Sequence, residues 1–199
     1  ASGGTLYGDP DPSRLPLGED EPHAPLSPYG VSKMAAVDYL ASYEALYGLA
    51  GTSLALANVY GPRQDPHGEA GVVAIFANRL LAGELCTVFG DGAQTRDFIF
   101  VKDVVSVMVK GMCDLHEDSC QVVNVGSGHS VSISKLLQHI CAAVGVEPNI
   151  ILKDLPDGDP VSSGGNYTKL RTVLGVQTGE FVKLEDGLRQ TVDYQRGSV

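Results

Sequence analysis

Apolar runs with strand-like composition alternate with segments of helical periodicity along most of this chain. Residues 52–61 (TSLALANVYG) are expected to form one buried strand that stops at a glycine and a proline, and residues 71–84 repeat apolar side chains at helical spacing. This alternation predicts an α/β fold with a largely parallel sheet. Further strands are expected within residues 85–92, 96–101, 120–128 and 149–155, further helices at 28–47, 101–115, 132–145 and 184–196, and the most loop-like stretch is 157–168.

The helix expected at residues 28–47 carries signals at both ends. Ser27 is suited to accept a hydrogen bond as the N-cap, and Pro28 fits the first helical position because its missing N–H has no partner there anyway. Gly48 follows the helix and favours a left-handed cap. By the same reasoning, Asp103 is expected to cap the helix at 101–115.

Charge and composition exclude several classes of protein. The net charge of −10 argues against nucleic-acid binding, which needs a basic face. No apolar run reaches the ~20 residues of a membrane span, and we expect a cytoplasmic protein. The cysteines form no CxxC pair, so we expect free thiols in a reducing compartment. The four are Cys86, Cys113, Cys120 and Cys141.

The sequence SPYGVSK places Tyr29 four residues before Lys33 in the first expected helix. Residues i and i+4 share a helix face, with Cβ atoms ~5–6 Å apart. An ammonium group within ~4–6 Å favours the ionised form of a phenol, and a phenol tuned in this way exchanges a proton with a substrate hydroxyl. Taken alone, the spacing is weak evidence, because it occurs by chance in many helices and favours a half-buried tyrosine beside a solvated lysine.

Three segments in a fixed order give this pair a context. They are SPYGVSK, NVYGPRQ (58–64) and GDGAQTRDFIFVKDV (90–104), preceded by ASGGTLYGD at residues 1–9. Together they resemble the extended short-chain dehydrogenase/reductase family, and within it the nucleotide-sugar epimerases and dehydratases. The resemblance covers essentially the whole chain. It implies the C-terminal portion of a doubly wound (Rossmann-like) sheet, with a smaller mixed substrate domain.

The resemblance assigns the catalytic roles. Tyr29 matches the tyrosine that acts as general base or acid on a sugar hydroxyl. Lys33 matches the lysine that holds the ribose of a nicotinamide cofactor, NAD, and favours the ionised tyrosine. The hydroxyl residue that shares the proton is Ser2 when the double glycine is treated as an insertion, and Thr5 is the alternative.

The resemblance also implies a nucleotide-sugar site. Asn58 matches an asparagine that contacts the diphosphate or the sugar, although an asparagine here could instead cap the turn after its strand. Arg96 matches an arginine that pairs with the diphosphate, for which the two parallel donors of a guanidinium are suited. The pocket is expected to include the backbone near Val72 and Val73.

Two positions are expected to flank the base of a uridine nucleotide. They are Thr87 and Phe89, and Phe89 has the alternative of a core position. The chain departs from the family in the later loop, where PDGD (156–159) stands in place of a segment that usually begins with arginine. Lys153 is the nearest residue that could compensate for that missing charge.

A second departure concerns the cofactor. Dinucleotide binding in this fold needs a strand, a glycine-rich turn and a helix, with an acidic residue ~20 positions on. The nearest match, at 122–137, has Gly126 and Gly128 but Val131 at the third glycine position, and the resemblance places it near the end of the fold. We therefore expect the family's N-terminal part to be missing, supplied by a longer polypeptide or by another chain, or lost in a structural relative.

The expected function is an NAD-dependent UDP-sugar epimerase that oxidises and re-reduces a ring carbon, with this chain inactive alone. Residues 1–60 would belong to the dinucleotide-binding domain and 61–199 to the substrate region, with about 101–130 returning to the main sheet. Alternatives are a non-catalytic or split subunit of a larger assembly, or a dehydratase or reductase of the same fold. A dehydratase needs an acidic pair in the SGGTLYG turn, which has none. Relatives commonly pair through the helix that begins at Pro28 and the helix before it, which belongs to the missing part, so a homodimer is expected only when that part is present.

Overall fold

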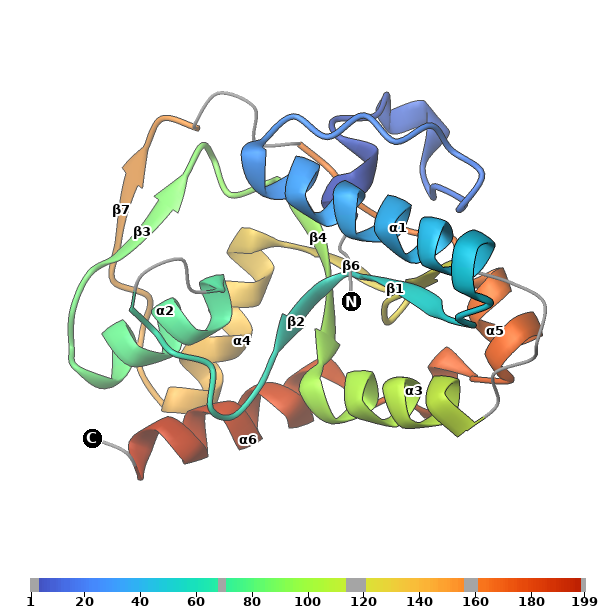
Figure 1. The fold of residues 1–199 in the computed structure, drawn as a ribbon. Coiled ribbons are helices and arrows are strands. Elements are labelled where there is room, and N and C mark those ends of the chain that lie inside the picture. The colour runs from blue at the N-terminus through green and yellow to red at the C-terminus, as the bar shows by residue number, and fades with distance from the viewer. Residues whose placement is uncertain (1–3, 68–70, 114–120, 156–160, 198–199) are drawn as a thin grey trace.

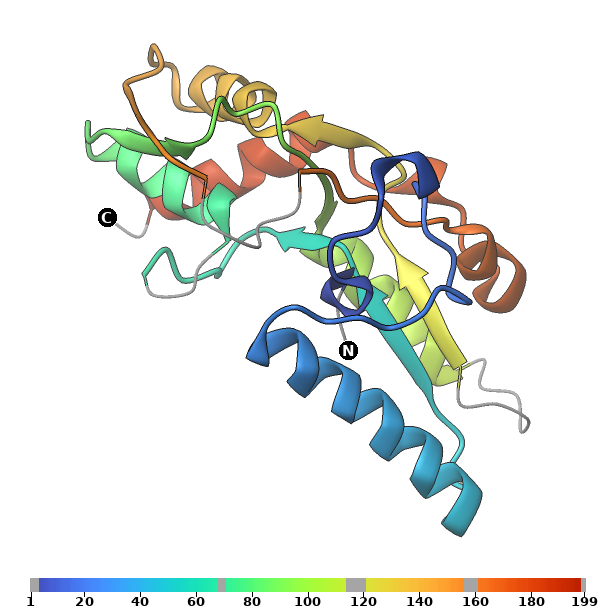
Figure 2. The ribbon, with the colours of Figure 1, turned by 90° about the horizontal axis from the view of Figure 1, so that it is seen from above.

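The computed structural model describes residues 4–67, 71–113, 121–155 and 161–197. It has the α/β class that the alternation predicts, with helices packed around short parallel strand pairs (Figures 1 and 2). No described helix is both long and apolar enough to cross a bilayer. The helices are α1 (Pro28–Tyr47), α2 (Val72–Leu81), α3 (Val101–Cys113), α4 (Ile133–Val144), α5 (Thr168–Leu174) and α6 (Leu184–Arg196), with 3₁₀ turns η1 (Gly4–Tyr7), η2 (Pro12–Arg14) and η3 (Thr178–Glu180).

Seven strands form three small groups in the described part of the chain. The groups are β1 (Thr52–Leu56) with β5 (Gln121–Val125), β2 (Asn58–Tyr60) with β4 (Thr95–Phe100) and β6 (Ser130–Ser132), and β3 (Cys86–Phe89) with β7 (Ile150–Lys153). Every pair is parallel except β4–β6, which is antiparallel. A largely parallel arrangement was predicted, and parallel strands need the helical crossovers that the chain supplies.

The single strand expected at residues 52–61 is wrong, because the chain forms two strands there. β1 pairs with β5 up to Leu56, and the Ala57 amide still donates to the Val125 carbonyl at 2.8 Å. From Asn58 the chain pairs with β4 instead. An apolar sequence does not encode this change of partner, since both halves are equally suited to a strand.

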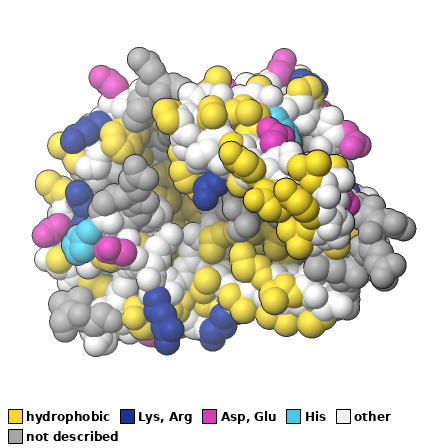
Figure 3. All heavy atoms as spheres, viewed as in Figure 1, with side chains coloured by type: hydrophobic (Ala, Val, Ile, Leu, Met, Phe, Trp, Pro, Cys, Tyr) yellow, Lys and Arg dark blue, Asp and Glu magenta, His cyan; other side chains and the backbone are white. Residues whose placement is uncertain are grey.

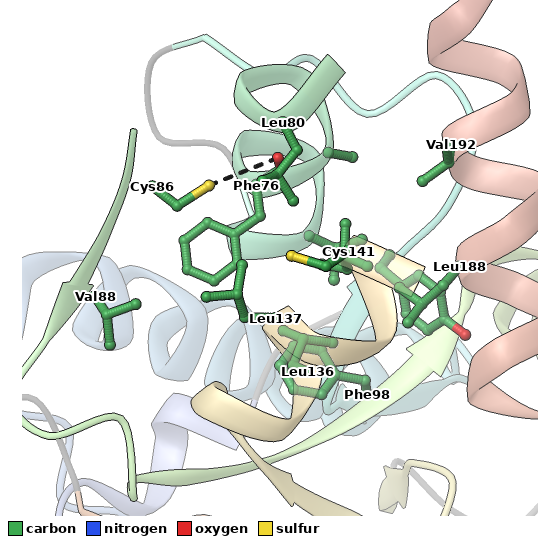
Figure 4. Close-up of a cluster of buried hydrophobic side chains, with 14 of the residues drawn as sticks. Phe76, Leu80, Cys86, Val88, Phe98, Leu136, Leu137, Cys141, Leu188 and Val192 are labelled. Carbon is green, nitrogen blue, oxygen red and sulfur yellow. Dashed lines mark hydrogen bonds between the residues drawn. The ribbon is translucent and has the colours of Figure 1, made fainter. Parts of the chain in front are cut away.

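Three groups of buried side chains hold these elements together. The largest joins α2, α4 and α6 to β3 and β4, and Figure 4 shows Phe76, Leu137 and Leu188 converging there. A second lies between α3, α5 and the β1–β5 pair, and a third between η1, α1 and β1. Of the expected free thiols, Cys86 and Cys141 lie in the largest cluster, Cys113 is exposed, and Cys120 lies outside the described residues.

The ends of α1 form as predicted. The Gly30 amide donates to Ser27 Oγ at 3.1 Å, and Gly48 takes the left-handed conformation with φ 66°. The expected cap by Asp103 is wrong. Its carboxylate accepts a hydrogen bond from the Val182 amide at 3.0 Å, because the segment before α6 packs over the start of α3.

Candidate active site

Tyr29 and Lys33 lie on one face of the first turns of α1. The Lys33 ammonium nitrogen is 5.2 Å from the centre of the Tyr29 ring. Tyr29 is 54% exposed, so the pair faces solvent and is open to a ligand. An ammonium over an aromatic face at an exposed site is worth about 0.5–1 kcal/mol, which orients the two side chains but does not hold the helix in place.

The start of α1 is held by close packing around a glycine. A Cβ on Gly30 would lie 2.9 Å from the Pro25 Cβ and 3.2 Å from the Thr5 carbonyl oxygen, so only glycine fits without displacement. This contact places η1, with the exposed Thr5, against the turn that carries Tyr29. Ser2 lies outside the described residues, and the choice between Ser2 and Thr5 as the catalytic hydroxyl stays open.

A buried polar relay fixes η1 to the sheet. Tyr7 Oη donates to Asn124 Oδ1 at 2.7 Å, and Asn124 Nδ2 donates to the Leu17 carbonyl at 3.0 Å. Burial raises the pKa of Tyr7 to about 12, with a further contribution from the charge of Glu19. Sequence reasoning missed this relay. Its only signals were a tyrosine before a glycine at one place and an asparagine in an apolar strand more than a hundred residues later.

Asn58 and Arg96 lie on neighbouring strands. Asn58 is paired with Phe98, and Arg96 is two residues before Phe98 on β4. Because side chains alternate along a strand, the asparagine and the guanidinium are expected on the same face of this pair. Asn58 is exposed, and Arg96 is half-buried with its Nη1 donating to the Thr95 carbonyl at 2.9 Å. The two strands therefore carry an amide and a guanidinium at neighbouring positions.

The remaining predicted contacts lie on α2 and β3. Val73 is 1% exposed and belongs to the core, so only the backbone near it can reach a ligand, whereas Val72 is half-buried at the start of α2. Thr87 is half-buried, and Phe89 is 42% exposed, so the core alternative for Phe89 is wrong. Figure 3 shows a hollow on this face of the molecule, below the start of α1 and beside α2 and β3.

Lys153 lies next to Phe89 across the β3–β7 pair. The two residues are partners in the ladder, and the Gly90 amide donates to the Lys153 carbonyl at 2.8 Å. A cation therefore stands beside the aromatic position, and PDGD itself lies outside the described residues. Among the residues that the structure describes, no group of three histidine, cysteine or acidic side chains is placed to hold a metal ion.

The fold agrees with the comparisons. The chain belongs to the NAD dependent epimerase/dehydratase family, whose model matches residues 1–126. It is 45% identical over 198 residues to a UDP-glucose 4-epimerase of Mycolicibacterium smegmatis, a match that covers 98% of this chain and 61% of that protein.

Solved structures give the same result. A UDP-glucose 4-epimerase of Thermotoga maritima with UDP-glucose superposes on the whole chain with a TM-score of 0.91 and 39% identity, over 62% of its own length. The Thermus thermophilus UDP-glucose 4-epimerase, in complex with NAD, superposes on the whole chain with a TM-score of 0.87 and 37% identity, over 63% of its length. The chain thus spans about three fifths of these relatives and corresponds to their C-terminal part.

Replacing Tyr7 with phenylalanine tests the buried relay through its pH dependence. The unfolded phenol ionises near its ordinary pKa of 10.0, whereas the folded one stays protonated up to a pKa of about 12. Its contribution to folding is therefore complete below pH 10 and is lost as the pH rises from 10 to 12. Over this window we expect the wild type to lose about 1–2 kcal/mol more unfolding free energy than Tyr7→Phe, measured by urea unfolding.

The matched control is Tyr39→Phe, which removes the same atom from a side chain that is 69% exposed. Its loss of stability with pH should follow the wild type. An equal loss in wild type and Tyr7→Phe would show that Tyr7 does not carry the effect.

Proposed function

We propose that the complete protein is an NAD-dependent UDP-sugar 4-epimerase, and that this chain supplies its catalytic tyrosine and its sugar-nucleotide site. The observation that carries the proposal is the solvent-facing contact between Lys33 and Tyr29 at the start of α1. The named relatives support the reaction, since the two structures compared are UDP-glucose 4-epimerases, one solved with UDP-glucose and the other with NAD.

The residues present suit the expected reaction. Tyr29 removes the proton from a ring hydroxyl, and Lys33, whose ammonium lies against the same ring, would donate to the ribose hydroxyls of NAD. A hydroxyl from Ser2, or from Thr5, hydrogen-bonds to the same reacting oxygen. NAD, when bound, would supply the hydride acceptor for the oxidation of the sugar carbon and the hydride donor for its re-reduction. The keto sugar turns over between these two steps, so that the hydride would return to the opposite face of the carbon, and Tyr29 returns the proton to the oxygen on that carbon.

A second set of residues, separate from Tyr29 and Lys33, is proposed to hold the sugar nucleotide. We infer that Arg96 and Asn58 bind the diphosphate, that the backbone at Val72 and Val73 lines the pocket, and that Thr87 and Phe89 flank the uracil. A guanidinium donates two parallel hydrogen bonds to phosphate oxygens, which suits Arg96. Lys153, beside Phe89, replaces the charge that the PDGD loop lacks.

NAD itself needs residues beyond this chain. No glycine-rich fingerprint precedes α1 in the printed sequence, so we propose that the pyrophosphate is held by a segment of the same polypeptide or by another chain. Residues 1–60 then belong to the cofactor-binding domain and 61–199 to the substrate region, and the β1–β5 pairing supports a return of about 101–130 to the main sheet. The isolated chain is expected to be inactive, and the location cytoplasmic.

The exposed face of α1 supports a homodimer. Tyr39, Tyr43, Leu46 and Tyr47 recur at i, i+4, i+7 and i+8, and they are 50–73% exposed. Figure 2 shows α1 at the margin of the described molecule. An apolar stripe of this kind on a helix indicates an interface in the assembled protein, and we propose that a second copy covers it.

A charge on that stripe tests the homodimer. In sedimentation velocity, the complete wild-type protein should run as a dimer at micromolar concentration, and Tyr43→Glu should run as a monomer because it buries a charge in an apolar contact. Tyr194→Glu is the control, since Tyr194 lies on α6 and is 43% exposed, and it should stay dimeric. A monomeric wild type, or a dimeric Tyr43→Glu, would contradict the proposal.

The decisive assay for the activity is the interconversion of UDP-glucose and UDP-galactose by the complete protein with NAD. In that assay Arg96→Lys should raise KM roughly tenfold, and Arg96→Ala up to about a hundredfold, because a hydrogen bond to a charged group is worth about 1.5–3 kcal/mol. In calorimetry with UDP alone, wild type should bind most tightly, Arg96→Lys more weakly and Arg96→Ala most weakly. A protein that binds NAD and UDP-glucose without converting the sugar would favour the non-catalytic subunit.

A further inference from the structure

A buried carboxylate lies immediately after the proposed diphosphate-binding arginine. Asp97 is 2% exposed and accepts four hydrogen bonds. The donors are the Ser127 amide at 3.0 Å, Ser127 Oγ at 2.6 Å, the Gly128 amide at 2.9 Å and Tyr167 Oη at 2.6 Å. A buried charge with this number of donors is stabilised in place, so Asp97 fixes β4 to the turn after β5 and to Tyr167.

The Tyr167 hydroxyl fits beside Asp97 because residue 126, directly after β5, is a glycine. A Cβ on Gly126 would lie 2.1 Å from Tyr167 Oη and 2.8 Å from Asp97 Oδ2, so any larger residue would displace the hydroxyl. Burial and the charge of Asp97 raise the pKa of Tyr167 far above its ordinary value, so the phenol stays a donor. Sequence reasoning used Gly126 only as part of a rejected cofactor motif.

Tyr167 ends a segment that links two parts of the site. We name residues 161–167 the strap. At its first end the Thr95 amide donates to the Val161 carbonyl at 3.0 Å, and the Ser163 amide donates to the Thr95 carbonyl at 3.1 Å. At its second end the Leu17 amide donates to the Gly164 carbonyl at 3.0 Å, and the Asn166 amide donates to the Leu17 carbonyl at 2.7 Å.

Each end of the strap reaches one half of the proposed site. Thr95 directly precedes Arg96. Leu17 also accepts from Asn124, which in turn accepts from Tyr7 in η1, the turn that packs on the start of α1. A continuous set of hydrogen bonds therefore runs from the strand of the arginine to η1, and η1 in turn packs against the first turn of α1, the helix of Tyr29.

We propose that Tyr167 is a positioning residue that, through its hydrogen bond to Asp97, holds the strap and thereby sets the separation between Arg96 and Tyr29. The inference rests on the proposed epimerase function. A diphosphate held by Arg96 and a sugar held at Tyr29 must both be in place for turnover, whereas UDP alone needs only the arginine side. Loss of the hydrogen bond should therefore affect turnover more than the affinity for UDP.

The test compares Tyr167→Phe and Gly126→Ala with wild type in the complete protein. Both variants should exchange the Ser163 and Asn166 amide hydrogens faster, lower kcat for UDP-glucose by about tenfold or more, and leave the Kd for UDP within about threefold. Val107→Ala is the control for stability alone, because Val107 is fully buried in the cluster of α3 and is not part of the strap. It should lower Tm while leaving strap exchange and kcat unchanged.

The outcomes separate this inference from the proposed function. If wild type converts UDP-glucose and Tyr167→Phe behaves like Val107→Ala, the positioning role is wrong and the epimerase proposal stands. Unchanged exchange of the strap amides in Tyr167→Phe overturns the inference whatever the activity. If wild type neither binds UDP nor converts UDP-glucose, the proposed function fails, and with it the link from the strap to turnover.

Discussion

At Ala57 the chain changes its strand partner, and this change connects the β1–β5 pair to the group of β2, β4 and β6. The Ala57 amide is bonded to the last residue of β5, and the next residue begins the ladder with β4. Before this point Ala55 packs with α1 and η1, and after it Tyr60 packs with α2, α4 and α6, while α3 contacts both strands. Because Asn58 is the first residue after the change, the partner switch decides that it stands beside the strand of Arg96.

Hydrogen bonds between distant segments give the site its shape, whereas the reactive pair contributes little stability. The Lys33–Tyr29 contact is exposed and worth under about 1 kcal/mol. The elements around the pair are instead held in place by the close packing at Gly30 and by hydrogen bonds to the buried acceptors Asn124 and Asp97. Unpaired buried polar groups are costly, so these contacts restrict the backbone to one arrangement. Tyr29, the proposed catalytic residue, stays accessible because other residues hold its helix in place.

Local signals predicted most elements, and long-range contacts explain what was missed. Helical spacing and end signals were sufficient for α1, including Ser27 and the Tyr29–Lys33 face. Two short elements were missed because long-range contacts define them more than their own sequences do. β6 forms by pairing with β4, and α5 is held by the burial of Leu170. The site residues came from a family resemblance, but which of them lie together depends on strand register. The local sequence likewise gave no sign that Asp103 accepts a hydrogen bond from the Val182 amide instead of capping its own helix.

The central claim is that Tyr29 moves the proton of a sugar held in part by Arg96. Its most direct measurement is kcat for UDP-glucose and Kd for UDP in Tyr29→Phe, which deletes only the phenolic oxygen. The account predicts that kcat falls by at least about a hundredfold, the range of acid–base catalysis, while the Kd for UDP stays within about threefold of wild type. Turnover that survives the substitution, or a loss of UDP binding as large as the loss of turnover, would contradict it.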